Sequence, residues 1–390
     1  HGIDQIVVTA TPLGSTVEDL AQPTTVLLGE DLAKKQSTSI GETLSREPGL
    51  SSTYFGPVSS RPVIRGQFGE RVRVLTNGLD ALDASAFSED HQVTVESLLA
   101  QRIEINRGPA TLLYGRGAAG GLVNVVDTRF INEPLEKAVN GGVALGGDTA
   151  SGIRDGAVRA QFGIDTIAFN ADYFYRSTEN IGIPGFAESK ALRVREEAEG
   201  GEAEEGEEEA FGVVENTDSE TSGGALGASF ISDNGYFGVS FSGFDSDYGI
   251  PGHHEHEEEE APLPGQEEEE EFVRIDLEQT RVDAAGEYDL EGSFLRGIRF
   301  RAAVNDYKHT EFEGAETGTM YDVQGTDGRI ELRHAPLGIM EGAIGLQYRR
   351  EDFDAIGDEA FLPQSDTSSF SLFLFEEFEL SDAWVLQASA

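Results

Sequence analysis

The segment GIPGHHEHEEEE at residues 249–260 gathers three of the chain's seven histidines and places them beside a run of glutamates. Neutral imidazole and carboxylate together make a nitrogen and oxygen donor set that suits zinc and its neighbours better than calcium. His253, His254 and His256 are therefore candidate metal ligands. The alternative is a solvated loop, because a block of like charges repels itself and buries little surface. The segment alone does not decide between the two.

Composition limits the chemistry that these residues can do. The chain has 390 residues and no cysteine, which excludes thiolate zinc sites, disulfide bonds and thiol catalysis. The formal net charge is −44, and much of it comes from three glutamate-rich runs. This balance argues against a nucleic-acid partner, which needs clustered lysine and arginine, and favours attraction of cations. These runs occupy residues 196–209, 255–260 and 267–271.

Membrane helices are absent from the sequence pattern, since no apolar run approaches the roughly 20 residues that such a helix needs. The first residues also lack the charged and apolar regions of a signal peptide. The chain is therefore either soluble or a mature exported protein whose membrane elements are strands.

Strict alternation of apolar and polar residues begins near residue 137. In RGIRFRAAVNDYKHTE, Phe300 and Val304 share one face, and Ala303 and Asn305 share the other. Segments of about 10 alternating residues with unequal connections are typical of a transmembrane β-barrel, although a soluble sandwich also alternates. In a barrel, an arginine at Phe300 would face lipid, so we expect it to be tolerated less well than one at Ala303, which would face the interior.

Two domains are indicated by the shift in pattern. Residues 13–130 read as a small mixed α/β domain, with a short helix at Val95–Ala100 followed by a strand in RIEIN. Residues 137–390 contain roughly ten strands, with short turns alternating with long acidic loops near 177–221 and 246–272. No closing strand is evident at the end, so the pattern predicts about half of a larger barrel.

The glycine-rich segment GRGAAGG at residues 115–121 formally matches a dinucleotide-binding motif. That motif requires a helix to follow, and the sequence LVNVV predicts a strand instead. We interpret these glycines as positions of tight turns or close backbone approach. No nucleophile, histidine and acid can be assembled from the spacing, so the sequence does not indicate an enzyme or a catalytic cofactor.

Four ordered blocks carry a family resemblance. DQIVVTA (4–10), PVIRG (62–66), VRVLTNGLD (72–80) and RIEINRGPATLLYGRGAAGGLVNVV (102–126) together resemble the plug domain of TonB-dependent outer-membrane receptors. The resemblance implies a plug inside a 22-stranded barrel in the bacterial outer membrane, energised by the TonB complex. Residues 1–12 would then be the coupling segment, a TonB box, whose β-prone residues can add as a strand to the partner. Those residues are Asp4, Gln5, Ile6, Val7, Val8, Thr9 and Ala10.

A narrower resemblance connects the chain to the zinc-uptake branch of these receptors. SEDHQVTVE, NDYKHTEFEG and YGIPGHHEHE look like the segments that bind metal in that branch. The resemblance implies that Asp90, His91 and Glu311 are ligands, with a further histidine from beyond residue 390. Continuing the alternation from Asn305 places His309 and Glu311 on the interior face of one strand, so His309 is a further candidate.

The sequence therefore predicts energy-coupled import of a divalent metal ion, with zinc as cargo. His253, His254 and His256 would capture the ion, and Asp90, His91 and Glu311 would bind it more deeply. The alternatives are the same fold importing a siderophore, haem or nickel, and a surface-binding barrel that transports nothing. His334 and His1 are interpreted as structural and terminal residues, respectively.

Overall fold

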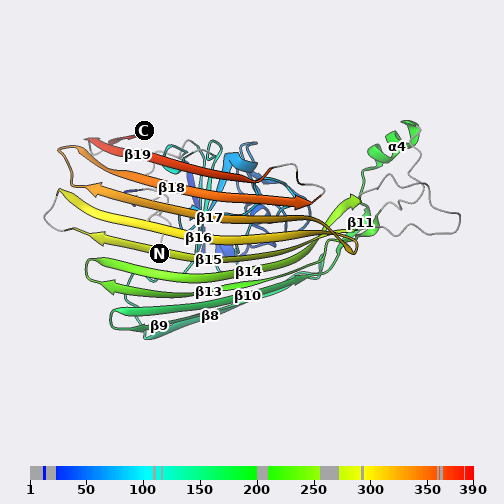
Figure 1. The fold of residues 1–390 in the computed structure, drawn as a ribbon, viewed down its shortest axis with the longest axis horizontal. Helices are drawn as coiled ribbons and strands as arrows, with labels where there is room; N and C mark the ends of the chain where they lie inside the picture. The colour runs from blue at the N-terminus through cyan, green and yellow to red at the C-terminus, as the bar shows by residue number, and fades with distance from the viewer. Residues whose placement is uncertain are drawn as a thin grey trace.

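The computed structural model describes residues 12–14, 23–108, 111–115, 117–199, 210–254, 272–290, 294–357, 360, 363–381 and 383–390. A small domain of mixed topology lies against the inner face of a large curved antiparallel sheet (Figure 1). Among the described residues, no helix combines the length and the apolar character needed to cross a membrane. The small domain contains β1 (Thr24–Leu28), α1 (Gly29–Ala33), α2 (Ile40–Leu44), β2 (Leu50–Ser52), β3 (Pro62–Ile64), η3 (Gly69–Arg71), β4 (Val72–Thr76), β5 (Leu79–Asp80), β6 (Arg102–Asn106), α3 (Thr111–Tyr114) and β7 (Gly121–Val126).

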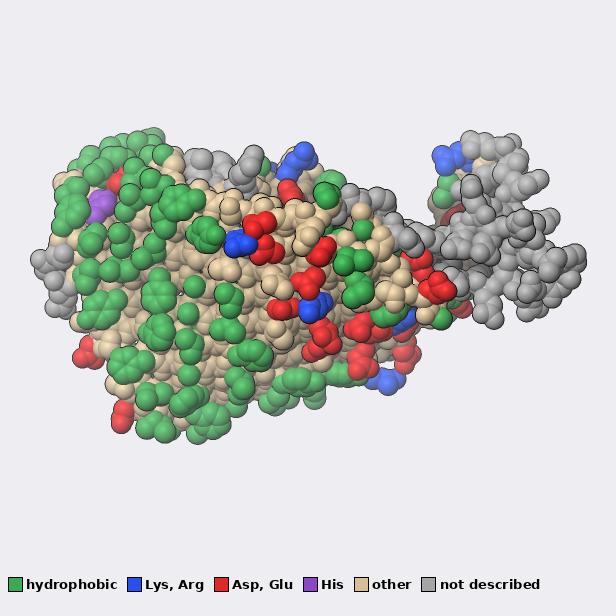
Figure 2. Space-filling view, viewed as in Figure 1, with side chains coloured by type: hydrophobic (Ala, Val, Ile, Leu, Met, Phe, Trp, Pro, Cys, Tyr) green, Lys and Arg blue, Asp and Glu red, His purple; other side chains and the backbone are tan. Residues whose placement is uncertain are grey.

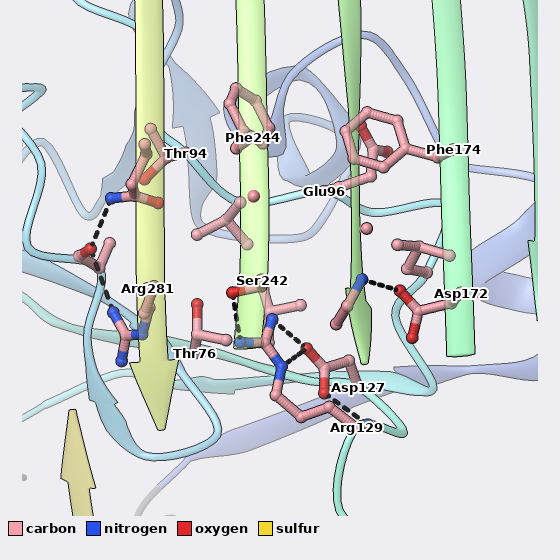
Figure 3. A pocket seen from close by; sticks show the side chains of 18 residues that line it. Thr76, Thr94, Glu96, Asp127, Arg129, Asp172, Phe174, Ser242, Phe244 and Arg281 are labelled. Carbon is pink, nitrogen blue, oxygen red and sulfur yellow. Dashed lines mark hydrogen bonds and ion pairs between the residues drawn. The ribbon is translucent and has the colours of Figure 1, made fainter. Parts of the chain in front are cut away.

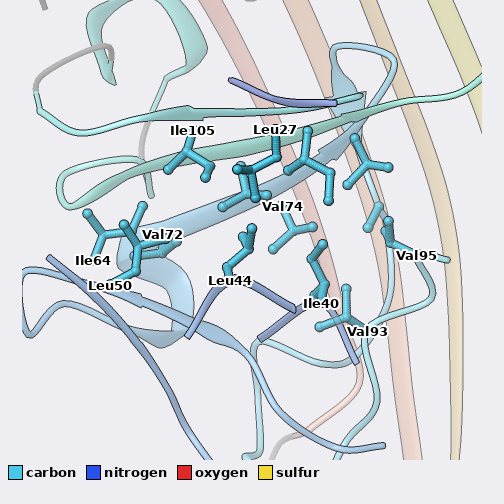
Figure 4. Packing of buried hydrophobic residues seen from close by; sticks show 14 of the residues in the cluster. Leu27, Ile40, Leu44, Leu50, Ile64, Val72, Val74, Val93, Val95 and Ile105 are labelled. Carbon is cyan, nitrogen blue, oxygen red and sulfur yellow. The ribbon is translucent and has the colours of Figure 1, made fainter. Parts of the chain in front are cut away.

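The sheet of the small domain has the order β1-β6-β7-β4-β5. β7 pairs parallel with β4 and antiparallel with β6, and every residue of this central strand is buried. This burial explains its nearly continuous apolar sequence, GLVNVV, because a central strand covered on both faces needs apolar residues throughout. Apolar side chains from the strands and from α2 form one core, shown in Figure 4 with Leu27, Ile40, Leu44, Val74 and Ile105 among its members.

The helix predicted at Val95–Ala100 is wrong. The structure has turns and bends there, and the β6 strand predicted in RIEIN follows directly. So short a segment gains few helical hydrogen bonds for the conformational entropy it loses. Tertiary contacts decide its shape, since Val95 packs in the core and Glu96 accepts a hydrogen bond from Arg176 of the large sheet at 3.0 Å.

Glycines in the segment 115–121 have the roles that the sequence predicts. Gly117 has φ +94°, and a Cβ there would lie 2.8 Å from the carbonyl oxygen of Glu70. Gly121 has φ +140°, and its Cβ would lie 2.3 Å from the carbonyl oxygen of Asn106. Both positions therefore require glycine for backbone conformation and for close approach between strands.

The large sheet has eleven strands in the order β20-β19-β18-β17-β16-β15-β14-β13-β10-β9-β8, and each neighbouring pair is antiparallel. This agrees with the roughly ten strands expected from alternation. The strands are β8 (Val139–Gly147), β9 (Arg154–Ile164), β10 (Ile167–Thr178), β13 (Ser219–Ser232), β14 (Gly235–His254), β15 (Phe272–Asp289), β16 (Leu295–Glu313), β17 (Glu316–His334), β18 (Met340–Gly357), β19 (Ser365–Ser381) and β20 (Trp384–Ser389).

The two faces of this sheet differ as the alternation predicts. Apolar side chains on the outer face are exposed, including Phe169, Phe241 and Val304 at 46%, 53% and 50%. Figure 2 shows them covering the end of the sheet away from α4 (Lys190–Glu199), while acidic side chains gather toward the α4 end. Residues of the opposite parity, such as Asn305 and Tyr307, are buried against the small domain.

The long connections begin later than the sequence predicts. β14 continues past residue 246 to His254, where it pairs with Phe272 of β15. The amide of Asn216 stabilises this extension, because its Nδ2 donates to the carbonyl oxygens of Ile250 and Val273 at 2.9 and 2.8 Å. In the other predicted loop, the described residues form α4 and a hairpin of β11 (Ile181–Phe186) and β12 (Phe211–Val214).

Candidate metal centre

Three candidate ligands converge where the small domain meets the large sheet. His91 lies in the loop between β5 and β6, whereas His309 and Glu311 project inward from β16. All three are buried, and one ligand atom from each lies within 4.8 Å of the others. The predicted alternation on β16 is the reason that both of its residues reach the interior.

The distances define a compact cluster around one carboxylate oxygen. Oε1 of Glu311 lies 3.2 Å from Nε2 of His91 and 3.4 Å from Nε2 of His309. The two imidazole rings approach with their centroids 4.4 Å apart. Side chains from two parts of the chain far apart in sequence therefore direct nitrogen and oxygen donors to one place.

The partners of the imidazoles show which nitrogens face the cluster. Nδ1 of His91 lies 3.0 Å from the carbonyl oxygen of Ala84, which only accepts, so this nitrogen carries the hydrogen. Nε2 of a neutral His91 then presents a lone pair to Glu311. Nδ1 of His309 is paired with the hydroxyl of Tyr307 at 2.7 Å, and Nε2 of His309 is buried without a hydrogen bond. Glu311 is thus faced by two imidazoles, and a neutral His91 leaves a lone pair directed at its carboxylate, an arrangement that a cation between them would stabilise.

Asp90 lies at the edge of this cluster. Its Oδ1 is 3.9 Å from Nε2 of His91 and accepts a hydrogen bond from the hydroxyl of Ser88. The predicted pair of adjacent ligands is therefore close to the cluster, with His91 at its centre and Asp90 beside it.

Electrostatics around His91 favour a positive charge. Burial alone would lower the pKa of His91, but the hydrogen bond to Glu311 and the charge of Asp90 raise it, and the net pKa is above its ordinary value. A bound metal cation would meet the same negative surroundings as a proton on this ring.

Two further aromatic residues, which the sequence pattern does not single out, lie close to the cluster. Tyr321 pairs with His309 across β16 and β17, and its ring centroid lies 4.4 Å from that of His309 and 5.0 Å from that of His91. Tyr248 of β14 is fully buried nearby. Alternation along β17 would have placed Tyr321 on the interior face, but only the strand register places it beside His309.

The other predicted site residues lie elsewhere. His253 and His254 are at the end of β14, where the structure describes the backbone alone, and His256 lies outside the described residues. The coupling segment 4–10 also lies outside them. His334 pairs with Glu376 of β19 at 3.2 Å and is separate from the metal cluster, as expected for a structural residue.

A second polar region lies between the small domain and the sheet. It surrounds a cavity of about 50 Å³ that is lined by Asp127, Arg129, Asp172 and Arg281 among others (Figure 3). Arg129 contacts Asp127 at 2.7 Å and Asp283 at 3.0 Å, and Arg281 contacts Asp283 at 2.9 Å. We call these residues the ion-pair region. Asp127 and Asp283 are thus paired with guanidinium groups inside the protein, whereas Asp172 accepts hydrogen bonds from Asn170 and from the backbone nitrogen of Ala225.

Residues 16–122 match the TonB-dependent receptor plug domain family. The small domain is thus a plug domain, and the eleven-stranded sheet has the fold of TonB-dependent receptor barrels, which are outer-membrane proteins. The predicted fold class is confirmed, and the predicted outer-membrane location agrees with this fold.

Three solved structures illustrate the similarity. The copper transporter OprC has a TM-score of 0.70 at 14% identity, over 94% of this chain and 54% of that chain. A mutant of the ferric enterobactin receptor PfeA from Pseudomonas aeruginosa has 0.69 at 15%, over 98% and 58%. The siderophore receptor PiuA from Acinetobacter baumannii has 0.63 at 14%, over 100% and 66%. This chain therefore spans between about half and two thirds of the length of these receptors, and what it shares with them is the fold.

Proposed function

We propose that this chain acts in TonB-dependent import of a divalent metal ion, zinc in particular, across the bacterial outer membrane. The observation that carries the proposal is the convergence of His91, His309 and Glu311, three buried side chains whose possible ligand atoms lie within 4.8 Å of one another. The plug-domain match and the barrel fold supply the transport context.

The donor set supports zinc as cargo. Two imidazole nitrogens and a carboxylate oxygen form a borderline-soft set that zinc binds well, and calcium and magnesium prefer sites made of oxygen. Asp90 is close enough to join as an oxygen ligand after a small side-chain movement. The same negative surroundings disfavour an anionic siderophore, which needs cationic and aromatic residues.

The location of the site supports controlled release. Because His91 belongs to the plug and His309 and Glu311 belong to the barrel, displacement of the plug separates the ligands and lowers affinity for the ion. The coupling segment, Asp4–Ala10, would transmit the force from TonB by pairing as an added strand. His253, His254 and His256, with the neighbouring glutamates, would raise the ion concentration above this site through many weak contacts.

Uptake and binding can be separated by one deletion in the full-length protein. Removing residues 4–10 should abolish zinc accumulation by cells and leave zinc binding by the purified protein unchanged, because the segment is proposed to transmit force. Cellular zinc measured by elemental analysis and affinity measured by calorimetry give the two readouts. Normal accumulation through the deletion variant would contradict energy-coupled transport.

Copper is a second candidate cargo, since imidazole donors suit it too and divalent copper binds such sites more tightly than zinc. Competition between the two ions in cells supplied with limiting amounts of each distinguishes them. Preferential loss of zinc uptake on deleting the gene supports zinc, and preferential loss of copper uptake supports copper.

A further inference from the structure

Tyr248 of β14 contacts the plug on both sides of His91. Its hydroxyl accepts a hydrogen bond from the backbone nitrogen of Gln92 at 3.0 Å and donates one to the carbonyl oxygen of Asp90 at 3.0 Å. The side chain is 1% exposed, so water does not compete for these bonds. One barrel hydroxyl therefore holds the peptide groups that precede and follow the plug ligand.

The strand that carries Tyr248 is itself firmly placed. β14 pairs with β13 and β15 through this region, with Tyr248 opposite Ser219 and Ile275. Farther along, a Cβ at Gly56 of the plug would lie 3.2 Å from Cδ of Pro251, so plug and strand are in close contact here. The hydroxyl of Tyr248 is thus a fixed reference point for the plug loop.

Two further contacts hold the ring of His91. Nδ1 bonds the carbonyl oxygen of Ala84, which orients the imidazole but belongs to the same plug loop, and Nε2 contacts Oε1 of Glu311 at 3.2 Å, a contact that a metal ion between the two would replace. The bonds from Tyr248 instead fix the loop relative to the barrel, where His309 and Glu311 are located. A metal ion that is bound by the plug and the barrel together requires the two to be held in a fixed relative position, because ligand positions tolerate errors of only a few tenths of an ångström.

We infer that Tyr248 is a positioning residue for the metal centre. Its two hydrogen bonds to the plug backbone set His91 and Asp90 at the correct distance from the two barrel ligands. The inference rests on the proposed function of this centre. Loss of the hydroxyl leaves the ligands chemically unchanged and frees the loop, so zinc binds less tightly and dissociates faster. Loss of outer-shell partners of metal ligands typically lowers affinity by about 10–100-fold.

The test compares Tyr248→Phe with Tyr236→Phe in the full-length protein. Both remove one hydroxyl from β14, but Tyr236 lies toward the other end of the strand, packed near Ile231. We expect zinc affinity to fall about 10–100-fold in Tyr248→Phe only, with a faster dissociation rate. Cobalt, used as a spectroscopic substitute for zinc, should show altered visible absorption in Tyr248→Phe, which a general loss of stability would not produce.

Two outcomes overturn the inference in distinguishable ways. If the unmodified protein and Tyr248→Phe bind zinc with the same affinity and dissociation rate and have the same cobalt spectrum, the hydroxyl of Tyr248 has no role in positioning the ligands. If the unmodified protein itself does not bind zinc or cobalt, the proposed metal centre is wrong, and so is the positioning role of Tyr248.

Discussion

The metal centre and the ion-pair region both lie between the plug and the inner face of the barrel sheet, but their charges are arranged differently. In the ion-pair region, Asp127 and Asp283 each contact a guanidinium group within 3.0 Å. In the metal centre, Glu311 contacts only the two imidazoles of His91 and His309 among its described ion-pair partners.

This difference distinguishes buried charges that are paired within the protein from a buried carboxylate that could bind a cation from solution. Buried carboxylates are costly unless they are paired, and the ion-pair region provides the partner within the protein. In the metal centre, Glu311 faces two imidazoles, and under the proposed function the compensating charge is a proton or a metal ion taken up from solution. The ion-pair region would then hold the plug against the barrel, and the metal centre would exchange its ion.

Breaking the ion-pair region should have the largest effect on stability. Arg129→Leu leaves Asp127 and Asp283 without their shared guanidinium, and we expect a loss of about 3–5 kcal/mol in the free energy of unfolding. Denaturant titration of the purified protein measures the loss. The control is Arg350→Leu, which removes ion pairs that are exposed to solvent and should therefore leave the stability nearly unchanged. Zinc affinity should not change in either variant, and equal losses of stability would refute the contrast.

Removing a ligand should affect binding and leave folding nearly intact. His91→Ala deletes one nitrogen donor, and we expect zinc affinity to fall tenfold or more, about 1.4 kcal/mol at least. Calorimetric titration gives the affinity. His334→Ala serves as the control, because His334 contacts a carboxylate outside the metal centre. Normal zinc binding by His91→Ala would show that the plug supplies no ligand.

The dependence of binding on pH should reflect the charge of the centre. Burial lowers the pKa of His91, but the hydrogen bond with Glu311 and the charge of Asp90 together raise it above its ordinary value of 6.5, so without metal the ring keeps its proton to higher pH. Because the proton and the metal compete for Nε2, zinc affinity should fall as pH decreases through this raised pKa. In Glu311→Gln the fall should occur at lower pH, with weaker binding overall. Affinity measured across pH that falls at the same point in both proteins would contradict this coupling.

The capture loop should show the smallest effect on tight binding. Changing His253, His254 and His256 together to serine should slow uptake at scarce zinc and leave the affinity of the metal centre unchanged. When an ion is attracted by many weak ligands, removing some of them reduces capture only in part. Uptake assays and zinc titration measure the two quantities. Loss of all tight binding in this variant, with normal binding by His91→Ala, would assign the specific site to the loop.

The faces of the strands could be predicted from sequence because alternation is local. Phe300 and Val304 face outward and Tyr307, His309 and Glu311 face inward, as the pattern indicates. What fills the interior could not be predicted. Ala303 was expected to tolerate an arginine, but it is 2% exposed and packs against Leu79 and Leu82 of the plug. We now expect that substitution to be strongly destabilising.

The metal centre was predictable only in part for the same reason. Family resemblance suggested His91 and Glu311, and alternation suggested that His309 faces inward. The contacts of Tyr248 and Tyr321 depend on the register between strands and on the docking of the plug, which are set by contacts distant in sequence. For these residues, the sequence indicates which face of the strand each side chain occupies, and only the structure shows which residues it contacts.

The position of bound zinc can be measured by anomalous diffraction from crystals of the full-length protein soaked in zinc. We expect an anomalous peak at the zinc absorption edge between His91, His309 and Glu311, with zinc about 2.0–2.2 Å from the coordinating nitrogen and oxygen atoms. A structure in which zinc occupies other residues and this cluster keeps His91 bonded to Glu311 would contradict it.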